Sequence, residues 1–166
     1  MAQNAIFTIE KNKNIARDVL LLRLSGPTES LVRPGQFVDI RLPGFYLRRP
    51  FSPSAWGDGW LEVIYKVVGL GTARMSQFAK GTELDVLCGL GNGFDVAPAR
   101  GKRVLLVGGG VGTPPLHALA AALCAQGEDK VIAQFEGDTY GEWTGGGTAF
   151  GAGPAKGTLP GQMQVS

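Results

Sequence analysis

The sequence contains little of what metal centres and nucleophilic enzymes need: two cysteines and one histidine in 166 residues. Cys88 and Cys124 lie far apart and match no CxxC pattern, so we expect both to be small, buried apolar side chains. Two thiols are too few for a self-contained four-thiolate iron–sulfur site. His117 has no serine, cysteine or second histidine as a partner, so we expect it to serve packing or the surface. We therefore expect no catalytic residue and no metal ligand.

Long apolar runs and an excess of one charge are also absent. No stretch approaches the roughly 20 apolar residues of a membrane span, and residues 1–13 lack the apolar core of a signal peptide. The formal net charge is only +2, without the clustered basic excess of nucleic-acid binders. We therefore expect a cytoplasmic protein with no membrane or nucleic-acid partner. Small, locally held phosphates are compatible with this charge.

The first hundred residues have the pattern of an antiparallel β domain. Short β-rich runs, several of them alternating, are separated by Gly, Pro and Asp, which is typical of a barrel or a sandwich. A short helix is expected over residues 72–79, with Thr72 as its N-cap. The expected strands cover residues 5–11, 19–25, 36–42, 60–68 and 83–88.

A different pattern begins near residue 100. Residues 103–107 form a nearly continuous apolar run that leads into the glycine loop 108–112, and this predicts a strand. Thr113 is expected to cap a helix that has Pro114 at its first position and ends near residue 126. This is the opening β-loop-α unit of a nucleotide-binding sheet. Taken alone the loop does not separate a nucleotide site from a tight turn, because its spacing is not G-x-G-x-x-G.

After this helix the periodicity is lost. Residues 130–135 match a second parallel strand, but the Gly-rich sequence after residue 136 shows no helical pattern. A doubly wound domain needs several β-α units to cover both faces of its sheet. We therefore expect an incomplete Rossmann-like unit at 100–136 and an irregular tail, disordered or aberrant, at 137–166.

Three segments suit a bound anion. Residues 48–53 bring the guanidinium groups of Arg48 and Arg49 to the end of a strand. Residues 65–72 and 108–115 supply glycines and a hydroxyl, where backbone N–H groups can turn toward phosphate oxygens. Together they indicate two nucleotides on one protein. The alternative, a solvated surface pair, is favoured for Arg48 and disfavoured for Arg49.

Four motifs, in this order and at this spacing, resemble a known family. They are Arg-Pro-Phe-Ser at 49–52, Ile-Tyr-Lys at 64–66 followed by Gly71-Thr72, Leu-Gly-Asn-Gly-Phe at 90–94, and the glycine loop with Pro115-Leu116. Over residues 5–127 the chain resembles the electron-transfer subunit of NAD-dependent dihydroorotate dehydrogenase, one of the ferredoxin-reductase-like flavoproteins.

The resemblance implies a Greek-key barrel that binds FAD at 1–99, the start of an NAD-binding domain at 100–136, and, in intact members, a cysteine-rich segment with a [2Fe-2S] cluster. Electrons would pass between NAD(H) and the flavin of a separate catalytic subunit, the dihydroorotate dehydrogenase of pyrimidine biosynthesis, in a heterotetramer. The residues 90–94 would form a turn that closes the barrel and orients the FAD pocket.

The family's cofactor contacts can be carried over residue by residue. By this resemblance Arg49 would pair with the FAD pyrophosphate, and Ser52 would hydrogen-bond near the isoalloxazine. Gly71 and Thr72 would hold the second phosphate. The whole set of cofactor-binding positions that it implies is Arg49, Pro50, Phe51, Ser52, Ile64, Tyr65, Lys66, Gly71, Thr72, Gly109, Gly110, Gly112 and Thr113.

The chain departs from the family after the glycine loop. Intact members continue further and supply four clustered cysteines, whereas no cysteine follows Cys124 here. We expect a fragment, or a reading frame lost near residues 127–136, which would neither hold a cluster nor complete NADH oxidation alone. Two alternatives stay open: an NAD(P)H-dependent flavin or ferredoxin reductase with another acceptor, and a non-catalytic flavin-binding fragment.

Overall fold

The computed structural model describes residues 2–125. Contacts along the chain divide it into two compact units, Met1–Gly127 and Glu128–Ser166. The expected strand at 130–135 and the expected tail at 137–166 lie outside the described residues. The expected domain boundaries after residues 99 and 136 stay predictions.

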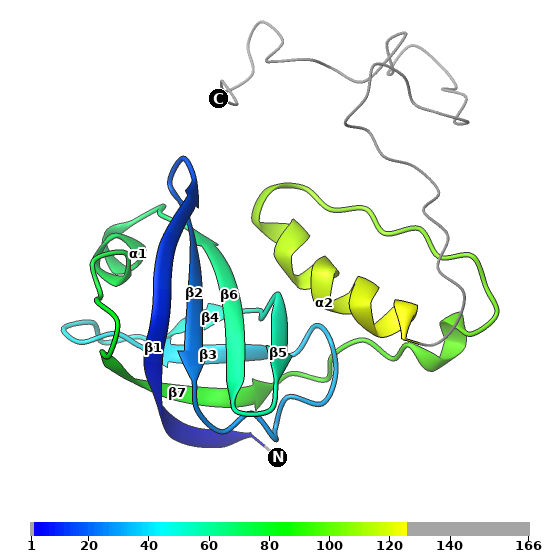
Figure 1. Ribbon diagram of the computed structural model, residues 1–166, viewed down its shortest axis with the longest axis horizontal. Coiled ribbons are helices and arrows are strands. Elements are labelled where there is room, and N and C mark those ends of the chain that lie inside the picture. The colour runs from blue at the N-terminus through cyan, green and yellow to red at the C-terminus, as the bar shows by residue number, and fades with distance from the viewer. Residues whose placement is uncertain (1, 126–166) are drawn as a thin grey trace, which may run out of the picture. The chain divides into compact units, whose positions relative to one another are not determined.

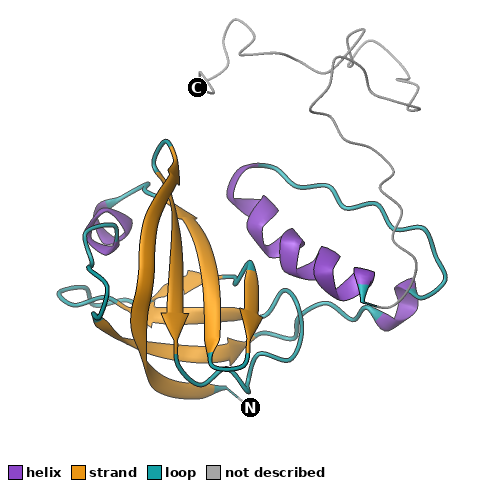
Figure 2. Ribbon diagram, in the orientation of Figure 1, coloured by secondary structure: helices purple, strands orange, loops and turns teal. Residues whose placement is uncertain are grey.

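The described residues form one antiparallel sheet of seven strands, with short helices beside it (Figures 1 and 2). The strand order is β4-β3-β7-β1-β2-β6-β5. An antiparallel β domain with a short helix is therefore confirmed. The strands are β1 (Gln3–Ala16), β2 (Val19–Ser25), β3 (Phe37–Arg41), β4 (Arg49–Phe51), β5 (Ala55–Gly57), β6 (Trp60–Lys66) and β7 (Glu83–Leu90).

Alternation along the strands builds the core. Every second residue of β2 and β6 is buried, and the antiparallel register places Leu22 opposite Val63 and Leu24 opposite Leu61. The buried side chains meet in one apolar cluster that also includes Phe7. Figure 1 shows β3 and β7 crossing β1, β2 and β6, and strands of both groups contribute buried side chains to this core.

The two edge strands, β4 and β5, were not predicted from the sequence. Each has only three residues, too few to show alternation. Pro50 stands in β4 and lies opposite Asp39 of β3. A proline lacks the N–H donor and is tolerated at a sheet edge. Within residues 2–125 no hydrogen-bonded ladder joins β4 to β5, so the sheet is open between these two edges.

The first helix, α1, is shorter than expected and begins earlier. It runs over Leu70–Met75 with Gly69 as its N-cap, so the prediction of Thr72 as the cap was wrong. Thr72 is the third helical residue, and its hydroxyl accepts hydrogen bonds from the backbone N–H groups of Val68 (3.0 Å) and Gly69 (3.2 Å). The hydroxyl therefore closes the helix start from inside the first turn rather than from the cap position.

The second helix, α2 (Thr113–Cys124), confirms the helix expected after the glycine loop. It follows a short 3₁₀ turn, η2 (Gly110–Gly112), and Gly112 rather than Thr113 is its N-cap. The strand expected at 103–107 is absent, because this segment has no regular structure. A strand needs a neighbour for its N–H and C=O groups, and no described strand pairs with these residues.

The two cysteines lie in different surroundings. Cys88 is fully buried, as expected, but Cys124 is exposed at the last residue of α2, which corrects the expectation for that thiol.

At the turn over residues 90–94, the Gln36 amide donates to the carbonyls of Gly89 and Gly91, both at 3.3 Å. The Phe94 N–H donates to the Pro34 carbonyl at 2.7 Å. The turn is thus fastened to the loop before β3.

No helix within residues 2–125 is long and apolar enough to span a membrane.

Candidate functional site

Arg49 occupies the start of β4. Its Nη1 donates to the carbonyls of Leu47 (2.9 Å) and Arg48 (3.2 Å), and the group lies 5.4 Å from the ring centre of Phe45. Among residues 2–125 no carboxylate forms an ion pair with Arg49, and neither Nε nor Nη2 has a protein acceptor. The guanidinium is held in place while two of its nitrogens keep free donors.

Gly71 lies directly against this guanidinium. A Cβ atom built on Gly71 would stand 2.8 Å from Nε and 3.3 Å from Nη2 of Arg49. The start of β4 and the first turn of α1 therefore converge, although the two residues are far apart in the chain. Only a residue without a side chain leaves the observed guanidinium position open, and this is a close-approach requirement on Gly71 rather than one of backbone strain.

The corner formed by residues 68–72, the α1 corner, has backbone donors at exposed Leu70 and half-buried Thr72, whereas Gly71 is buried. The N–H groups of Leu70, Gly71 and Thr72 belong to the first turn of α1 and have no acceptor four residues back. The Thr72 hydroxyl gives its proton to the Gly69 carbonyl at 3.1 Å while it accepts from Val68 and Gly69. Its hydrogen bonds are therefore satisfied within the corner, and it is the backbone that offers donors to an anion.

Arg48 has a structural role and is not a solvated surface residue. Its Nη2 contacts both carboxylate oxygens of Asp85 at 2.9 Å. Its Nη1 donates to the backbone carbonyls of Asp39 (3.2 Å) and Asp85 (3.1 Å). The surface position favoured for Arg48 is therefore corrected, and of the two arginines only Arg49 keeps donors that no protein acceptor occupies.

Behind the corner, aromatic side chains link β4 to β6. The rings of Phe51 and Tyr65 pack edge to face with centres 5.9 Å apart. Tyr65 is only 2% exposed and donates its hydroxyl proton to Asn12 Oδ1 at 3.1 Å. Burial raises the pKa of Tyr65 to about 12, with the hydrogen bond to Asn12 opposing part of that rise. A side chain buried in this way leaves Tyr65 only its backbone for contact with a cofactor.

The remaining predicted positions on the sheet have open surroundings. Pro50 and Lys66 are exposed, and Ser52 and Ile64 are half-buried. Ile64 and Lys66 lie on the face of β6 opposite the core, because the buried residues of that strand alternate with them. No described interaction occupies the Ser52 hydroxyl within residues 2–125, so the donors of this group are available.

The glycine loop forms a second, separate feature. Gly110 has φ +53°, a left-handed conformation that favours glycine, and Cβ atoms built on Gly109, Gly110 or Gly112 would meet only open space. Thr113 is exposed. The turn η2 lies beside β6, and α2 lies beside β5. The loop is therefore near the sheet strand that carries three of the predicted cofactor positions.

His117 ties α2 to the segment that follows β4, a contact that the sequence did not reveal. Its Nδ1 lies 3.0 Å from the backbone carbonyl of Ser54. A carbonyl oxygen only accepts, so Nδ1 carries the proton in this contact. Ser54 is itself fixed, because its N–H donates to the Glu62 carbonyl of β6 at 2.8 Å. A packing or surface role for His117 was expected, but this hydrogen bond was not predicted.

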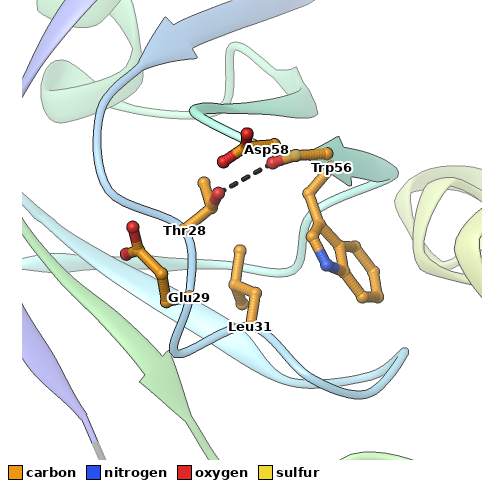
Figure 3. Close-up of a pocket in the computed structure, with 6 residues that line it drawn as sticks. Thr28, Glu29, Leu31, Trp56 and Asp58 are labelled. Atoms are coloured by element: carbon orange, nitrogen blue, oxygen red, sulfur yellow. Dashed lines mark hydrogen bonds between the residues drawn. The ribbon is translucent and has the colours of Figure 1, made fainter.

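Figure 3 shows a pocket that the predicted residues do not form. Its volume is about 300 Å³, and the Thr28 hydroxyl donates to the Gly57 carbonyl at 2.7 Å on its wall. None of the predicted cofactor positions lines it, so it is not part of the candidate site. The lining residues are Thr28, Glu29, Leu31, Trp56, Gly57 and Asp58.

Metal-binding side chains do not cluster in the part of the chain that the structure describes. No three His, Cys, Asp or Glu side chains within residues 2–125 are placed to hold a metal ion. Among the predicted positions within residues 2–125, Arg49 and Gly71 lie in direct contact.

Known proteins are similar in sequence to about three quarters of this chain. No family model matches it. The dihydroorotate dehydrogenase B (NAD(+)) electron transfer subunit of Fusobacterium nucleatum is 40% identical over 132 residues, which cover 75% of this chain and 51% of the relative. The same subunit of Shouchella clausii is 42% identical over 127 residues, covering 72% and 49%. The chain thus spans about half the length of these curated relatives.

Solved structures share the fold. The structure of an NADH-dependent reduced ferredoxin-NADP oxidoreductase superposes with a TM-score of 0.68 at 36% identity, covering 74% of this chain and 45% of that one. A cytochrome P450 reductase of Amycolatopsis superposes with a TM-score of 0.66 at 26% identity, covering 75% and 40%. The chain is therefore a homologue of the electron-transfer subunit of dihydroorotate dehydrogenase B, and it has a ferredoxin-reductase-like fold.

Proposed function

We propose that this chain binds FAD and, in its complete form, passes electrons between NAD(H) and the catalytic subunit of a dihydroorotate dehydrogenase in pyrimidine biosynthesis. The relatives' names support the pathway and the partner, because each is called an electron transfer subunit of that enzyme. The chain covers about half the length of these relatives, so the electron-transfer activity is proposed for the complete protein. The predicted cytoplasmic location stays a prediction.

One observation carries the FAD proposal: the Arg49 guanidinium lies against Gly71 with Nε and Nη2 free of protein acceptors. A planar guanidinium can give two parallel hydrogen bonds to a diphosphate. The free N–H groups of the α1 corner offer further donors at the same place. The residues therefore fit the diphosphate bridge of a dinucleotide such as FAD.

The other positions would complete the binding of FAD. Pro50 fixes the backbone after Arg49, so that Phe51 and Ser52 follow in a set direction. In this proposal Ser52 hydrogen-bonds near the flavin ring, and the backbone of β6 from Ile64 to Lys66 lines the cofactor. Bound FAD would supply the two-electron and one-electron chemistry that links a nicotinamide to one-electron carriers.

The glycine loop fits a nucleotide phosphate, whereas the thiols do not fit an iron–sulfur cluster. Gly109, Gly110, Gly112 and Thr113 surround open space beside β6, which fits a loop that receives the phosphates of NAD(H). The thiols do not fit a [2Fe-2S] cluster, because Cys88 is fully buried and Cys124 lies on α2 without further cysteines. We derive no electron-transfer step through a cluster in this polypeptide.

The proposal includes two finer features of the fold. The open sheet would close into a Greek-key barrel, and residues 100–136 would start a Rossmann-like domain. The short edge strands β4 and β5 and the helix α2 after its glycine loop support these features.

A second candidate is a flavin-dependent reductase with another electron acceptor. It is supported by the 36% identity to an NADH-dependent reduced ferredoxin-NADP oxidoreductase over 74% of the chain. The FAD site is the same in both candidates, and only the partner differs. Reduction of a supplied ferredoxin, without reduction of a dihydroorotate dehydrogenase catalytic subunit, would favour this candidate.

The test of the first candidate is FAD binding followed by anaerobic addition of NADH. We expect yellow protein with bound FAD, and flavin bleaching wherever the chain completes the NAD(H) site. Yellow protein whose flavin is not reduced by NADH would indicate a flavin-binding fragment without electron transfer from NADH. Colourless, folded protein that does not quench the fluorescence of added FAD would contradict the proposal.

The matching variant is Arg49→Ala. We expect FAD affinity to fall by about one to two decades, since a charge-assisted hydrogen bond is worth roughly 1.5 to 3 kcal/mol. Fluorescence titration with FAD measures this. Arg17→Ala removes an exposed arginine outside the site and serves as the control, which should bind FAD as the wild type does. Equal affinity of both variants would exclude Arg49 from the site.

A further inference from the structure

Asn12, on β1, makes three side-chain hydrogen bonds that connect distant parts of the chain. Its Nδ2 donates to the carbonyls of Met75 (2.9 Å) and Phe78 (3.1 Å), and its Oδ1 accepts the Tyr65 hydroxyl proton at 3.1 Å. Both amide donors and the amide acceptor are thus used. Figure 1 shows α1 beside β1, where this contact is made.

The network fixes which way the amide points. A flipped amide would turn its oxygen toward two carbonyl oxygens, which only accept. The nitrogen must therefore face Met75 and Phe78, and the oxygen must face Tyr65. An aspartate at position 12 has the same shape but no donor, so it could keep the bond from Tyr65 and would lose both bonds to the end of α1.

These bonds lie on a closed path that joins the two halves of the proposed FAD site. On one side Asn12 holds the carbonyl at the end of α1, whose first turn carries Gly71. On the other side it holds Tyr65, whose ring packs against Phe51 of β4. Phe51 is two residues from Arg49, and Arg49 lies against Gly71.

We propose that Asn12 is a positioning residue for the diphosphate site, holding the α1 corner and β4 at the separation that lets Arg49 and the corner share one diphosphate. This inference rests on the proposed binding of FAD. Asn12 touches neither Arg49 nor Gly71 in the described contacts, so its effect passes through Met75, Phe78 and Tyr65. A displaced corner would part the backbone donors from the guanidinium.

Asn12→Asp keeps the shape of the side chain, removes both donors and adds a negative charge next to the two carbonyls. We expect FAD affinity, measured by fluorescence titration, to fall about tenfold. This is the size of effect expected when one hydrogen bond to the diphosphate is lost through misalignment. We also expect the ³¹P resonances of bound FAD to shift, while the flavin absorbance band keeps its shape. A merely structural role would not move the ³¹P resonances of protein that remains saturated with FAD.

Asn14→Asp is the matched control. It places the same charge on the same strand, at an exposed position opposite Leu20. We expect it to bind FAD as the wild type does. Asn12→Ser removes the amide without adding charge and covers the case in which Asn12→Asp does not fold; it should shift affinity in the same direction.

A second readout needs no cofactor. Hydrogen exchange of the α1 amides in FAD-free protein should be at least about tenfold faster in Asn12→Asp than in Asn14→Asp, with the β2 and β6 amides unchanged. The Ala73 and Ser76 amides, bonded to Gly69 and Thr72, report on α1 directly.

The outcomes separate the two proposals. Wild-type protein that binds no FAD overturns the proposed function and, with it, the role of Asn12 toward FAD. Wild-type protein that binds FAD, together with an Asn12→Asp variant of equal affinity and equal α1 exchange, overturns only the positioning role. Faster α1 exchange with a tenfold loss of FAD affinity supports both.

Discussion

At the scale of single residues, Arg48 and Arg49 show how adjacent arginines take different roles. Arg48 is neutralised by Asp85, 37 residues further along the chain, whereas Arg49 has only backbone carbonyls and a phenylalanine ring around it. The sequence motif pointed to Arg49. It contained no sign of the Asp85 partner, because that contact depends on the pairing of β3 with β7.

Gly71→Ala separates binding from stability. The new methyl group would meet Arg49 Nε at 2.8 Å and push the guanidinium aside. Gly71 is helical, and alanine is favoured over glycine in a helix by up to about 1 kcal/mol. We expect FAD affinity to fall about tenfold while the free energy of unfolding stays equal or rises. Urea unfolding and FAD titration check both. A variant that loses both together would indicate a packing role for Gly71.

Tyr65 should make stability depend on high pH. Burial raises its pKa from 10.0 to about 12, so the folded protein keeps the phenolic proton after the unfolded chain has lost it. The free energy of unfolding should therefore decrease as the pH rises from 10 toward 12. Tyr65→Phe removes this contribution, so the difference between wild type and variant should shrink over that range in urea unfolding. A constant difference would mean that Tyr65 does not titrate in this way.

At the scale of elements, long alternating strands were predictable and short ones were not. The strand over residues 19–25 was predicted with the bounds of β2, because its leucines alternate between core and surface. The edge strands β4 and β5 carry no periodic signal in three residues each. The strand expected at 103–107 was wrong because an apolar run forms a strand only beside a partner, and partners cannot be read from the run itself.

The roles of polar residues inside a strand were harder still to predict from the sequence. Asn12 stands in β1 as one of several polar residues, and nothing in the sequence separates it from Asn14. Its role depends on the carbonyls of Met75 and Phe78, which only the fold brings to it. The candidate site could thus be predicted at the positions that face a ligand, and not at those that hold them.

The tether of α2 makes a prediction at this scale. In His117→Ala the hydrogen bond to the Ser54 carbonyl is lost, and α2 should exchange its amide hydrogens several-fold faster, as expected for a bond worth about 0.5 to 1.5 kcal/mol. The amides of β2 should not change. His117→Asn can donate from Nδ2 at a similar place and should restore part of the protection. Exchange mass spectrometry of residues 113–124 measures this, and unchanged exchange in His117→Ala would show that the apolar contacts of α2 suffice.

At the scale of the whole molecule, the account depends on two chain segments that meet at one point. The start of β4 supplies a guanidinium, and the α1 corner supplies backbone donors and a glycine. If both bind one diphosphate, their effects on FAD affinity cannot be independent, because residues that share a ligand contact couple in double-mutant cycles. Independent sites would instead contribute separately.

The most direct measurement is therefore FAD affinity in a cycle of wild type, Arg49→Ala, Gly71→Ala and the double variant. The account predicts that Gly71→Ala weakens binding about tenfold when Arg49 is present and has little further effect in its absence, a coupling of roughly 1 kcal/mol or more. Additive losses, or wild-type protein that does not bind FAD, would contradict it.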